Sequence, residues 1–313
     1  MMNLTNIKIV ADDIKSIKIQ WATNIAKAGM DILAKEIKKQ NFVSLKEFDT
    51  FLKQAIVILR QARATEPMLF NGLKYCLVSY KNLLSKGVDL KTMTVKLFQT
   101  CKTYLGDIER EEVLRPLIGA KLIKKNMHIM THCHSGSVVK MLITAHKQNK
   151  KIHVYNTETR PLYQWRKTSQ DLIKAGVPDT MITDDAAPFF VDNLYESDTY
   201  IDMVIIGSDA IKTDGSIYNK VGSFSIALAA WHSKIPVYIV GSLTKIDREG
   251  TVKIEQRSGK ELRPDAPKEL EIINYAFDMV PAKFITGIIT EYGIIKPKDI
   301  KKVVKKQCPW MIK

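Results

Sequence analysis

Hydrophobic side chains between residues 12 and 118 recur mainly at three- and four-residue spacing, which is the period of an amphipathic helix. The clearest example is the set Phe51, Ala55, Ile56, Ile58 and Leu59. Strand-like alternation is scarce in this part, and Ser44 followed by Glu47 forms a capping-box signature at a helix start. We therefore predict roughly four or five helices in this part of the chain.

Beyond about residue 120, short apolar runs alternate with amphipathic segments, which is typical of a parallel sheet with helical crossovers. The predicted strands are 127–131, 152–155, 180–183, 203–206 and 236–240. The predicted helices between them are 138–147, 163–175, 187–194 and 224–231. We therefore predict an α/β protein with a helical N-terminal domain, residues 1–118, and a second domain with a mainly parallel sheet, residues 119–313.

The last part of the chain carries two further predictions. A polar stretch at 247–268 contains glycine, proline and many charges, so we expect a mobile loop or a small hairpin. A helical stretch near 284–291 is expected before a basic tail, whose lysines we assign to a solvated helix face: Lys301, Lys302, Lys305 and Lys306.

The net charge of +15 comes from 48 Lys and Arg against 33 Asp and Glu, spread along the chain. This spread argues against a nucleic-acid-binding arm. It fits an anionic ligand, from a sugar phosphate to RNA, and equally a lysine-rich surface of a heat-adapted protein. The charge alone does not separate these alternatives.

The 4 cysteines are widely separated and lack C-x-x-C spacing, so the sequence indicates neither a disulfide framework nor a zinc ribbon. A reducing, cytoplasmic location fits this pattern best. No uncharged apolar run approaches the roughly 20 residues that a membrane span needs, and charges interrupt the N-terminus, unlike a signal peptide. We expect a soluble protein without a membrane partner.

The stretch 127–137 combines a strand, a tight turn and a helix start, and it carries Cys133 between His132 and His134. Backbone N–H groups at such a helix start form a natural anion site. A thiol there is expected to have a lowered pKa and to act as a base or nucleophile; the alternative is a small buried cysteine. The histidines lack a recognised metal-ligand spacing, so no metal is predicted.

Other strand ends are also polar, and in open parallel sheets ligands bind outside the carboxyl ends of the strands. Asp209 follows a continuous apolar run, typical of a strand buried on both faces. A carboxylate delivered there suits general acid or base work, although it could instead cap the next turn. The other strand-end segments are 158–160, 184–185 and 241–245.

Three cations are candidates for contacts with an anionic substrate. Lys220 precedes a predicted helix, where it would meet a phosphate or remain a surface charge. Arg63 precedes a helix of the N-terminal domain and would serve either the site or a salt bridge. Arg160 would pair with Glu158 or with a substrate phosphate, which suits its fork geometry.

Several of these segments together resemble one superfamily, which contains methylthioribose-1-phosphate isomerases, archaeal ribose-1,5-bisphosphate isomerases and the alpha, beta and delta subunits of initiation factor 2B. The resemblance covers about residues 55–295. It rests on Ala62-Arg63-Ala64-Thr65, Thr131-His132-Cys133, Glu158-Thr159-Arg160-Pro161 with Gln164, Gly207-Ser208-Asp209, Asn219-Lys220-Val221-Gly222, Asn274, Ala276-Phe277-Asp278, Pro281 and Ile289-Thr290-Glu291. It implies a helical N-terminal domain followed by a Rossmann-like catalytic domain.

The resemblance also implies roles for residues of this chain. Cys133 matches the catalytic proton-transfer residue and Asp209 its acid/base partner, and regulatory subunits typically lack one or both. Gln164 matches a substrate-binding position of the methylthioribose branch. The sequence around Cys133, in contrast, is more similar to that of the archaeal bisphosphate isomerases. The remaining matched substrate-contact positions are Arg63, Ser135, Gly136, Ser137, Asn219, Lys220 and Lys245.

One segment departs from the family pattern. The family's enzymes usually carry an Arg-Gly-Ala phosphate loop near the N-terminus, and this chain has Gln20-Trp21-Ala22 there. Arg to Gln removes a charge and a bidentate fork, and Gly to Trp adds bulk where the backbone should approach an anion. We therefore expect this departure to affect the affinity for the substrate, the choice of substrate and the activity.

We therefore predict an aldose-ketose isomerase that converts ribose 1,5-bisphosphate to ribulose 1,5-bisphosphate without a cofactor. The alternatives are a non-catalytic initiation factor 2B-like regulatory or nucleotide-sensing subunit and a methylthioribose-1-phosphate isomerase. The resemblance further implies a homo-oligomer, either a dimer or a dimer-based hexamer. A nucleotide activator stays open, and a nucleic-acid partner is not expected.

Overall fold

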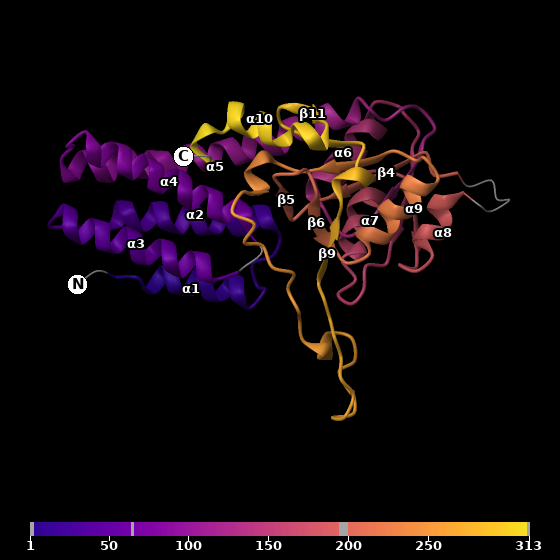
Figure 1. The fold of residues 1–313 in the computed structure, drawn as a ribbon, viewed down its shortest axis with the longest axis horizontal. Helices are drawn as coiled ribbons and strands as arrows, with labels where there is room; N and C mark the ends of the chain where they lie inside the picture. The colour runs from indigo at the N-terminus through magenta and orange to yellow at the C-terminus, as the bar shows by residue number, and fades with distance from the viewer. Residues whose placement is uncertain (1–2, 64–65, 194–199, 312–313) are drawn as a thin grey trace. The chain divides into compact units, whose positions relative to one another are not determined.

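A computed structural model gives the fold of the protein, and it describes residues 3–63, 66–193 and 200–311 (Figure 1). Contacts divide the chain into two compact units, which we call the helical unit and the sheet unit. The helical unit comprises Met1–Arg110, Thr244–Lys253 and Val304–Lys313, and the sheet unit comprises Glu111–Leu243 and Ile254–Val303. The domain boundary expected after residue 118 stays a prediction.

The helical unit is built on the helices that the apolar spacing predicts. Its helices are α1 (Thr5–Lys15), α2 (Ala22–Lys39), α3 (Leu45–Gln61), α4 (Pro67–Ser85) and the first part of α5 (Leu90–Ala120). The predicted cap is confirmed, because the Ser44 hydroxyl accepts a hydrogen bond from the Glu47 N–H at 3.2 Å. Gly87, at φ +63°, separates α4 from α5.

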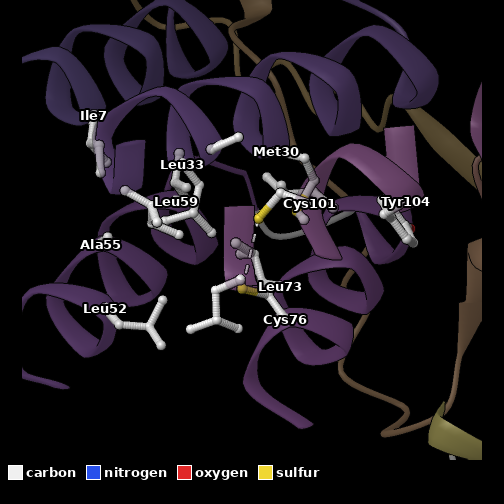
Figure 2. Packing of buried hydrophobic residues seen from close by; sticks show 14 of the residues in the cluster. Ile7, Met30, Leu33, Leu52, Ala55, Leu59, Leu73, Cys76, Cys101 and Tyr104 are labelled. Carbon is white, nitrogen blue, oxygen red and sulfur yellow. Dashed lines mark hydrogen bonds between the residues drawn. The ribbon is translucent and has the colours of Figure 1, made fainter. Parts of the chain in front are cut away.

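Figure 2 shows how the apolar faces of these helices meet in one core. Leu33 of α2, Leu59 of α3 and Leu73 of α4 are almost completely buried there. Cys76 of α4 and Cys101 of α5 face each other with 3.8 Å between their Sγ atoms. Because a fully buried side chain of this size contributes roughly 1.5–3 kcal/mol, this interlocking stabilises the helical unit.

The sheet unit contains a seven-stranded sheet in the order β11-β10-β7-β4-β1-β2-β3, which is parallel except for β11. All the strands predicted from the apolar runs are present in it. The sheet consists of β1 (His128–Thr131), β2 (His153–Thr157), β3 (Asp179–Ile182), β4 (Met203–Gly207), β7 (Val237–Val240), β10 (Gly287–Thr290) and β11 (Gly293–Ile295). The predicted α/β fold with a mainly parallel sheet is thus confirmed.

The predicted crossover helices are also present. α6 and α7 pack on each other, α8 packs on α9, and α9 contacts β4 and β7. Leu194, the predicted end of the third crossover helix, lies outside the described residues. These helices are α6 (Gly136–Lys147), α7 (Trp165–Lys174), α8 (Ala187–Asp192) and α9 (Ser223–His232).

Two parts of the sheet unit differ from expectation. The predicted helix at 284–291 is wrong, because a short 3₁₀ turn, Ala282–Phe284, leads there into β10. An apolar run such as Ile288-Ile289 fits a buried strand as well as a helix, so periodicity alone could not decide. In addition, an unpredicted antiparallel set pairs β5 with β6 and β6 with β9: β5 (Ala210–Lys212), β6 (Ile217–Lys220) and β9 (Phe277–Val280).

The polar stretch before β9 runs out and back as an extended excursion in Figure 1. Its two limbs meet at an isolated bridge between Gln256 and Tyr275, and a 3₁₀ turn, Gly259–Glu261, lies between them. This geometry agrees with the predicted loop or hairpin.

The basic tail is helical, as predicted. After a 3₁₀ turn, Pro297–Asp299, it forms α10 (Ile300–Gln307), and the four lysines assigned to a solvated face are exposed. The short elements left are 3₁₀ turns Leu243–Lys245 and Pro309–Met311 and the strand β8 (Ile246–Asp247). Among the described helices, none is both long and apolar enough to cross a membrane.

Candidate active site

The two predicted catalytic residues follow neighbouring strands of the sheet. Cys133 comes after β1 and Asp209 after β4, and these strands pair in parallel, with Ile129 opposite Met203. The strand order reverses between β1 and β4, since the chain continues outward from β1 to β2 and β3 and then returns to β4 on the other side. In doubly wound sheets such a switch point, at the carboxyl ends of the strands, is where ligands bind.

Cys133 has an unusual backbone conformation, with a φ of +63°. Its N–H donates to the hydroxyl of Thr159 at 3.1 Å, and its carbonyl accepts from the hydroxyl of Thr168 at 3.2 Å. A left-handed backbone is unfavourable for residues with a side chain, so these two hydrogen bonds hold an uncommon turn in place.

The environment of the thiol favours its protonated form. Burial raises the pKa of Cys133 to about 11; the positive charge of Lys220 opposes this shift, and the carboxylates of Asp209 and Asp184 add to it. The expectation of a lowered pKa is therefore wrong. α6 begins only at Gly136, so its N-terminal partial charge does not outweigh the loss of hydration around the thiol.

Asp209 is fixed by its backbone at the point where β4 passes into β5. Its N–H donates to the carbonyl of Tyr218 in β6 at 2.9 Å, and its side chain is half-buried. Every residue of β4 is buried, as the continuous apolar run predicted. The unpredicted antiparallel strands thus hold Asp209 beside the thiol on which its charge acts.

Lys220 and Asn219 lie at the end of β6, near Cys133 and the end of β4. Lys220 is only 4% exposed, its charge acts on both Cys133 and His132, and its Nζ lies 5.1 Å from the ring centre of Phe277. No carboxylate among the described residues forms an ion pair with it. The alternative of a surface charge is therefore wrong, because this ammonium is buried.

The start of α6 closes another side of the site. Ser135 is the N-cap residue of α6, and Gly136 and Ser137 form its first turn. A Cβ atom placed on Gly207, at the end of β4, would lie 2.8 Å from the Cβ of Ser135 and 4.0 Å from Oδ1 of Asn219. The helix start, the end of β4 and the end of β6 are thus in contact.

His132 has a structural role within this turn. Its Nε2 lies 2.9 Å from the carbonyl of Val221, which can only accept, so Nε2 carries the proton. Burial lowers the pKa of His132, so the ring is neutral and its Nδ1 accepts from the hydroxyl of Thr157 at 2.6 Å. Both ring nitrogens are thereby engaged within the protein. Among the described residues, no group of three or more His, Cys, Asp or Glu side chains could hold a metal ion.

Arg160 and Gln164 lie on the segment after β2. The carboxylate of Asp184, which follows β3, accepts from the N–H groups of Thr159 and Arg160, each at 2.8 Å. The Arg160 side chain is exposed, and it makes no ion pair with Glu158, so this alternative is wrong. Gln164 precedes α7, and its buried Oε1 has no hydrogen-bond partner among the described residues.

Arg63 and Lys245 belong to the helical unit, whereas the other predicted site residues belong to the sheet unit. Arg63 lies 3.6 Å from the carboxylate of the buried Glu66, as the salt-bridge alternative predicted. Lys245 is half-buried at the end of the 3₁₀ turn Leu243–Lys245. Ala64 and Thr65, which contributed to the resemblance, lie outside the described residues.

The departing segment Gln20-Trp21-Ala22 forms the start of α2. Trp21 is the N-cap residue, with a φ of +66°, and its side chain is 44% exposed. Glycine adopts this backbone conformation without strain and tryptophan does not. The position therefore has a backbone geometry for which glycine is suited, and it carries a tryptophan side chain.

Three residues around Cys133 were not predicted to act there: Thr159, Thr168 and Asp184. In the sequence, Asp184 and Thr159 stand out only as strand-end residues, because their hydrogen bonds depend on a backbone geometry that no local pattern reveals. Thr168 is hidden in the middle of α7, where its spacing marks it only as a buried polar position.

Comparison with known proteins finds relatives among the proteins that the resemblance names. The chain matches the Initiation factor 2 subunit family over residues 18–297. It is 32% identical to the ribose 1,5-bisphosphate isomerase of Thermococcus kodakarensis over 313 aligned residues, which cover 97% of this chain and 95% of that protein.

Solved structures show the same fold. The translation initiation factor eIF-2B of Pyrococcus horikoshii OT3 shares the fold with a TM-score of 0.78, at 23% identity, over 94% of this chain and 98% of that chain. The 5-methylthioribose 1-phosphate isomerase of the same organism has a TM-score of 0.75, at 27% identity, over 96% of this chain and 87% of that chain.

Proposed function

Because the chain belongs to the Initiation factor 2 subunit family, which the match over residues 18–297 shows, we propose that it is a sugar-phosphate isomerase that converts ribose 1,5-bisphosphate to ribulose 1,5-bisphosphate. Relatives that are about 32% identical to this chain carry the names of sugar-phosphate isomerases. One of them, the ribose 1,5-bisphosphate isomerase of Thermococcus kodakarensis, aligns over nearly the whole chain.

The observation that carries the proposal is the burial of Lys220 beside Cys133 and Asp209. An ammonium that is 4% exposed and forms no ion pair among the described residues is costly to bury unless an anion joins it. A phosphate or a developing enolate oxygen on the substrate would supply that anion. The catalytic thiol and carboxylate would then face the adjacent carbon atoms.

The proton positions suggest how Cys133 and Asp209 divide the work. The 1-phosphate blocks simple ring opening, so one group must assist the ring oxygen while another manages hydrogen movement between C2 and C1. Because burial raises the pKa of Cys133 to about 11, the thiol holds its proton at neutral pH and acts as the acid. Asp209 then acts as the base, and such groups typically contribute on the order of 100- to 10,000-fold.

The phosphate contacts follow from the remaining residues. The N–H groups of Ser135, Gly136 and Ser137 lie at the start of α6, where an anion is favoured by free donors and by the helix dipole. The exposed guanidinium of Arg160 offers a fork for a second phosphate. We assign Asn219 to a substrate hydroxyl, and Arg63 and Lys245 to further substrate contacts.

The decisive experiment is an assay of the purified protein with ribose 1,5-bisphosphate, with product identified as ribulose 1,5-bisphosphate by NMR. Methylthioribose 1-phosphate is the parallel substrate, and Cys133→Ser is the control for a contaminating activity. We expect turnover of the bisphosphate by the wild type alone. Absence of product from both sugars would overturn the proposal.

One observation favours each alternative function. The buried Oε1 of Gln164, which finds no hydrogen-bond partner in the described part of the chain, would suit the methylthioribose branch. Equal or faster turnover of the thio-sugar would establish that function. Trp21 at the start of α2 favours a non-catalytic regulatory subunit. Binding of a nucleoside phosphate without turnover of either sugar would support that function.

The expected homo-oligomer stays a prediction. The exposed side of α9 supports it, because apolar side chains recur there at helical spacing: Phe224, Leu228 and Trp231, which are 39%, 39% and 54% exposed. Sedimentation of the wild type and of a Trp231→Glu variant would decide the oligomeric state.

A further inference from the structure

Two residues with left-handed backbones meet at the site. Cys133 has a φ of +63° and Thr159 a φ of +55°, and the N–H of the first donates to the hydroxyl of the second at 3.1 Å. For a β-branched residue such as threonine this conformation is a genuine outlier. Strained residues of this kind persist only where the surroundings hold them, and they gather at functional sites.

Asp184 holds the backbone of Thr159 in this conformation. Its carboxylate accepts from the N–H groups of Thr159 and Arg160, each at 2.8 Å, so both oxygens fix the strained turn. The Thr159 hydroxyl donates to the carbonyl of Thr157 at 3.2 Å, which leaves its lone pairs for the N–H of Cys133. Thr159 itself is completely buried.

Thr168 holds the other side of the same residue. Its hydroxyl donates to the carbonyl of Cys133 at 3.2 Å, and it is only 1% exposed. Because that hydroxyl has one proton, the contact of 3.1 Å with Nδ1 of His134 must have the ring nitrogen as donor. The hydroxyl of Thr168 is thereby oriented toward Cys133.

We propose that Thr159 and Thr168 form a threonine clamp, a pair of positioning residues that holds the Cys133 backbone at both its N–H and its carbonyl and so aims the thiol at the substrate. This inference rests on the proposed function for the identity of the substrate. The clamp itself is a statement about Cys133 and is testable without any substrate.

The clamp has two chemical consequences. It occupies the N–H of Cys133, so the phosphate must be bound by amides further along, at the start of α6. It also keeps the thiol in its desolvated environment, where the charges of Lys220, Asp209 and Asp184 act on it. A loosened clamp would let water reach the thiol and would move it away from the reacting carbon atoms.

Thr159→Val is the test variant, and Thr159→Ser is its matched control. Valine keeps the β-branched shape but removes the acceptor for the N–H of Cys133, whereas serine keeps the hydroxyl. Thr168→Val and Thr168→Ser form the second pair. Circular dichroism and the melting temperature show which variants are folded.

The first measurement is the alkylation rate of Cys133 by iodoacetamide as a function of pH, read by mass spectrometry of its peptide. In the valine variants better hydration brings the thiol toward its ordinary pKa, and we expect alkylation at pH 8 to be about 10-fold faster. The serine variants should stay within about 3-fold of the wild type. The other cysteines, Cys76, Cys101 and Cys308, are buried and serve as internal controls.

The second measurement is turnover of ribose 1,5-bisphosphate. We expect the valine variants to lose about 100-fold in kcat with little change in KM, because misplacement of a catalytic group by about 1 Å has this effect. Serine should restore most of the rate. A role limited to stability would lower the melting temperature without changing the pH profile of alkylation.

Each outcome separates the two proposals. If the wild type turns over no sugar phosphate, the alkylation rates still support or overturn the clamp. If the wild type is active and folded valine variants keep wild-type alkylation and kcat, the clamp is wrong and the isomerase stands. Serine variants that behave like the valine variants would also overturn it, because the hydroxyl would then not be the cause.

Discussion

The carboxylate of Asp278 accepts a hydrogen bond from the N–H of Gly222 at 2.7 Å. The same oxygen accepts from the N–H of Phe224 at 3.0 Å, so Asp278, on β9, caps the start of α9. Burial nevertheless raises the pKa of Asp278 to about 6, against these two hydrogen bonds. The link between the antiparallel strands and α9 therefore depends on pH.

Stability should fall as Asp278 loses its proton. Because the pKa is raised in the folded state, its stabilising effect is complete below about pH 4 and is lost as pH rises through about 6. Relative to Asp278→Asn, whose amide oxygen can still cap α9, we expect the wild type to lose about 2 kcal/mol across this range. Urea unfolding of both proteins between pH 4 and 7.5 measures this, and a constant difference would contradict it.

Cys133→Ser and Asp209→Asn should each abolish turnover while leaving the protein folded. Both changes keep the size of the side chain but remove the proton-transfer group, so the loss should reach on the order of 100- to 10,000-fold in kcat. Steady-state kinetics with ribose 1,5-bisphosphate and the melting temperature give the two readouts. Retained turnover in both variants would disprove the catalytic assignment.

The product also reports on the hydrogen transfer. Turnover in D₂O should introduce deuterium into ribulose 1,5-bisphosphate if the base on Asp209 exchanges its proton with solvent. Mass spectrometry of the product measures this. Product without deuterium would count against an enediolate that exchanges with water and would favour direct transfer of hydride.

Arg115 should be essential for stability. It is 1% exposed and binds two buried carboxylates, Glu111 and Glu291, each at 3.1 Å. Arg115→Met leaves both acids without their counter-charge, so we expect a loss of about 3–5 kcal/mol in the free energy of unfolding.

Arg110→Met is the matched control for this change. Arg110 pairs with Asp107 at 2.9 Å, but its side chain is 64% exposed, and such surface pairs contribute roughly 0–1 kcal/mol. Urea unfolding compares the two variants at neutral pH. Equal losses would show that burial of the Arg115 network is not what makes it important.

Gly207→Ala should disturb the site through Ser135. The added Cβ would lie 2.8 Å from the Cβ and 2.9 Å from the Oγ of Ser135, so the start of α6 must shift. We expect a loss of about 1–3 kcal/mol and a raised KM. Gly106→Ala lies in α5, where no neighbouring atom of residues 3–63, 66–193 or 200–311 comes within 4 Å of the added Cβ. This variant should instead be more stable by about 0.5–1 kcal/mol.

Restoring the family's phosphate loop should strengthen substrate binding. In the double variant Gln20→Arg and Trp21→Gly, arginine supplies a charged fork, and glycine suits the φ of +66° at residue 21. A hydrogen bond to a charged group contributes about 1.5–3 kcal/mol, which corresponds to a KM lowered by roughly 10- to 100-fold. Trp21→Gly alone should give less, and an unchanged KM in the double variant would show that this segment does not contact phosphate.

The sequence predicts the strands that are continuous apolar runs and the helices that bury one apolar face. The apolar runs of β1 and β4 and the helical spacing of α3 appear directly in the residue pattern. β5, β6 and β9 were not predicted because each is short and carries polar residues such as Asn219. At 288–289 two isoleucines fit helix and strand equally, and only pairing with β7 decides between them.

The sequence predicts where the candidate site residues lie in the fold, and it does not predict the environment of the Cys133 thiol. Strand ends select Cys133 and Asp209, because parallel strands deliver their carboxyl ends to one edge. The raised pKa of the thiol and the clamp around it depend on burial and on two left-handed backbones, which come from residues distant in sequence. Thr168 illustrates this, since nothing near it in the chain relates it to Cys133.

The helical unit is assembled from three separate stretches of chain, with boundaries at Arg110, Thr244, Lys253 and Val304. A gene split between β8 and β9, within the extended excursion, would therefore yield two fragments that each carry part of both units. β10 and α10 would reside on the second fragment and β1 to β7 on the first. Neither fragment could complete its sheet or its helical core alone, so the pair would work as a complementation system in which isomerase activity reports reassembly.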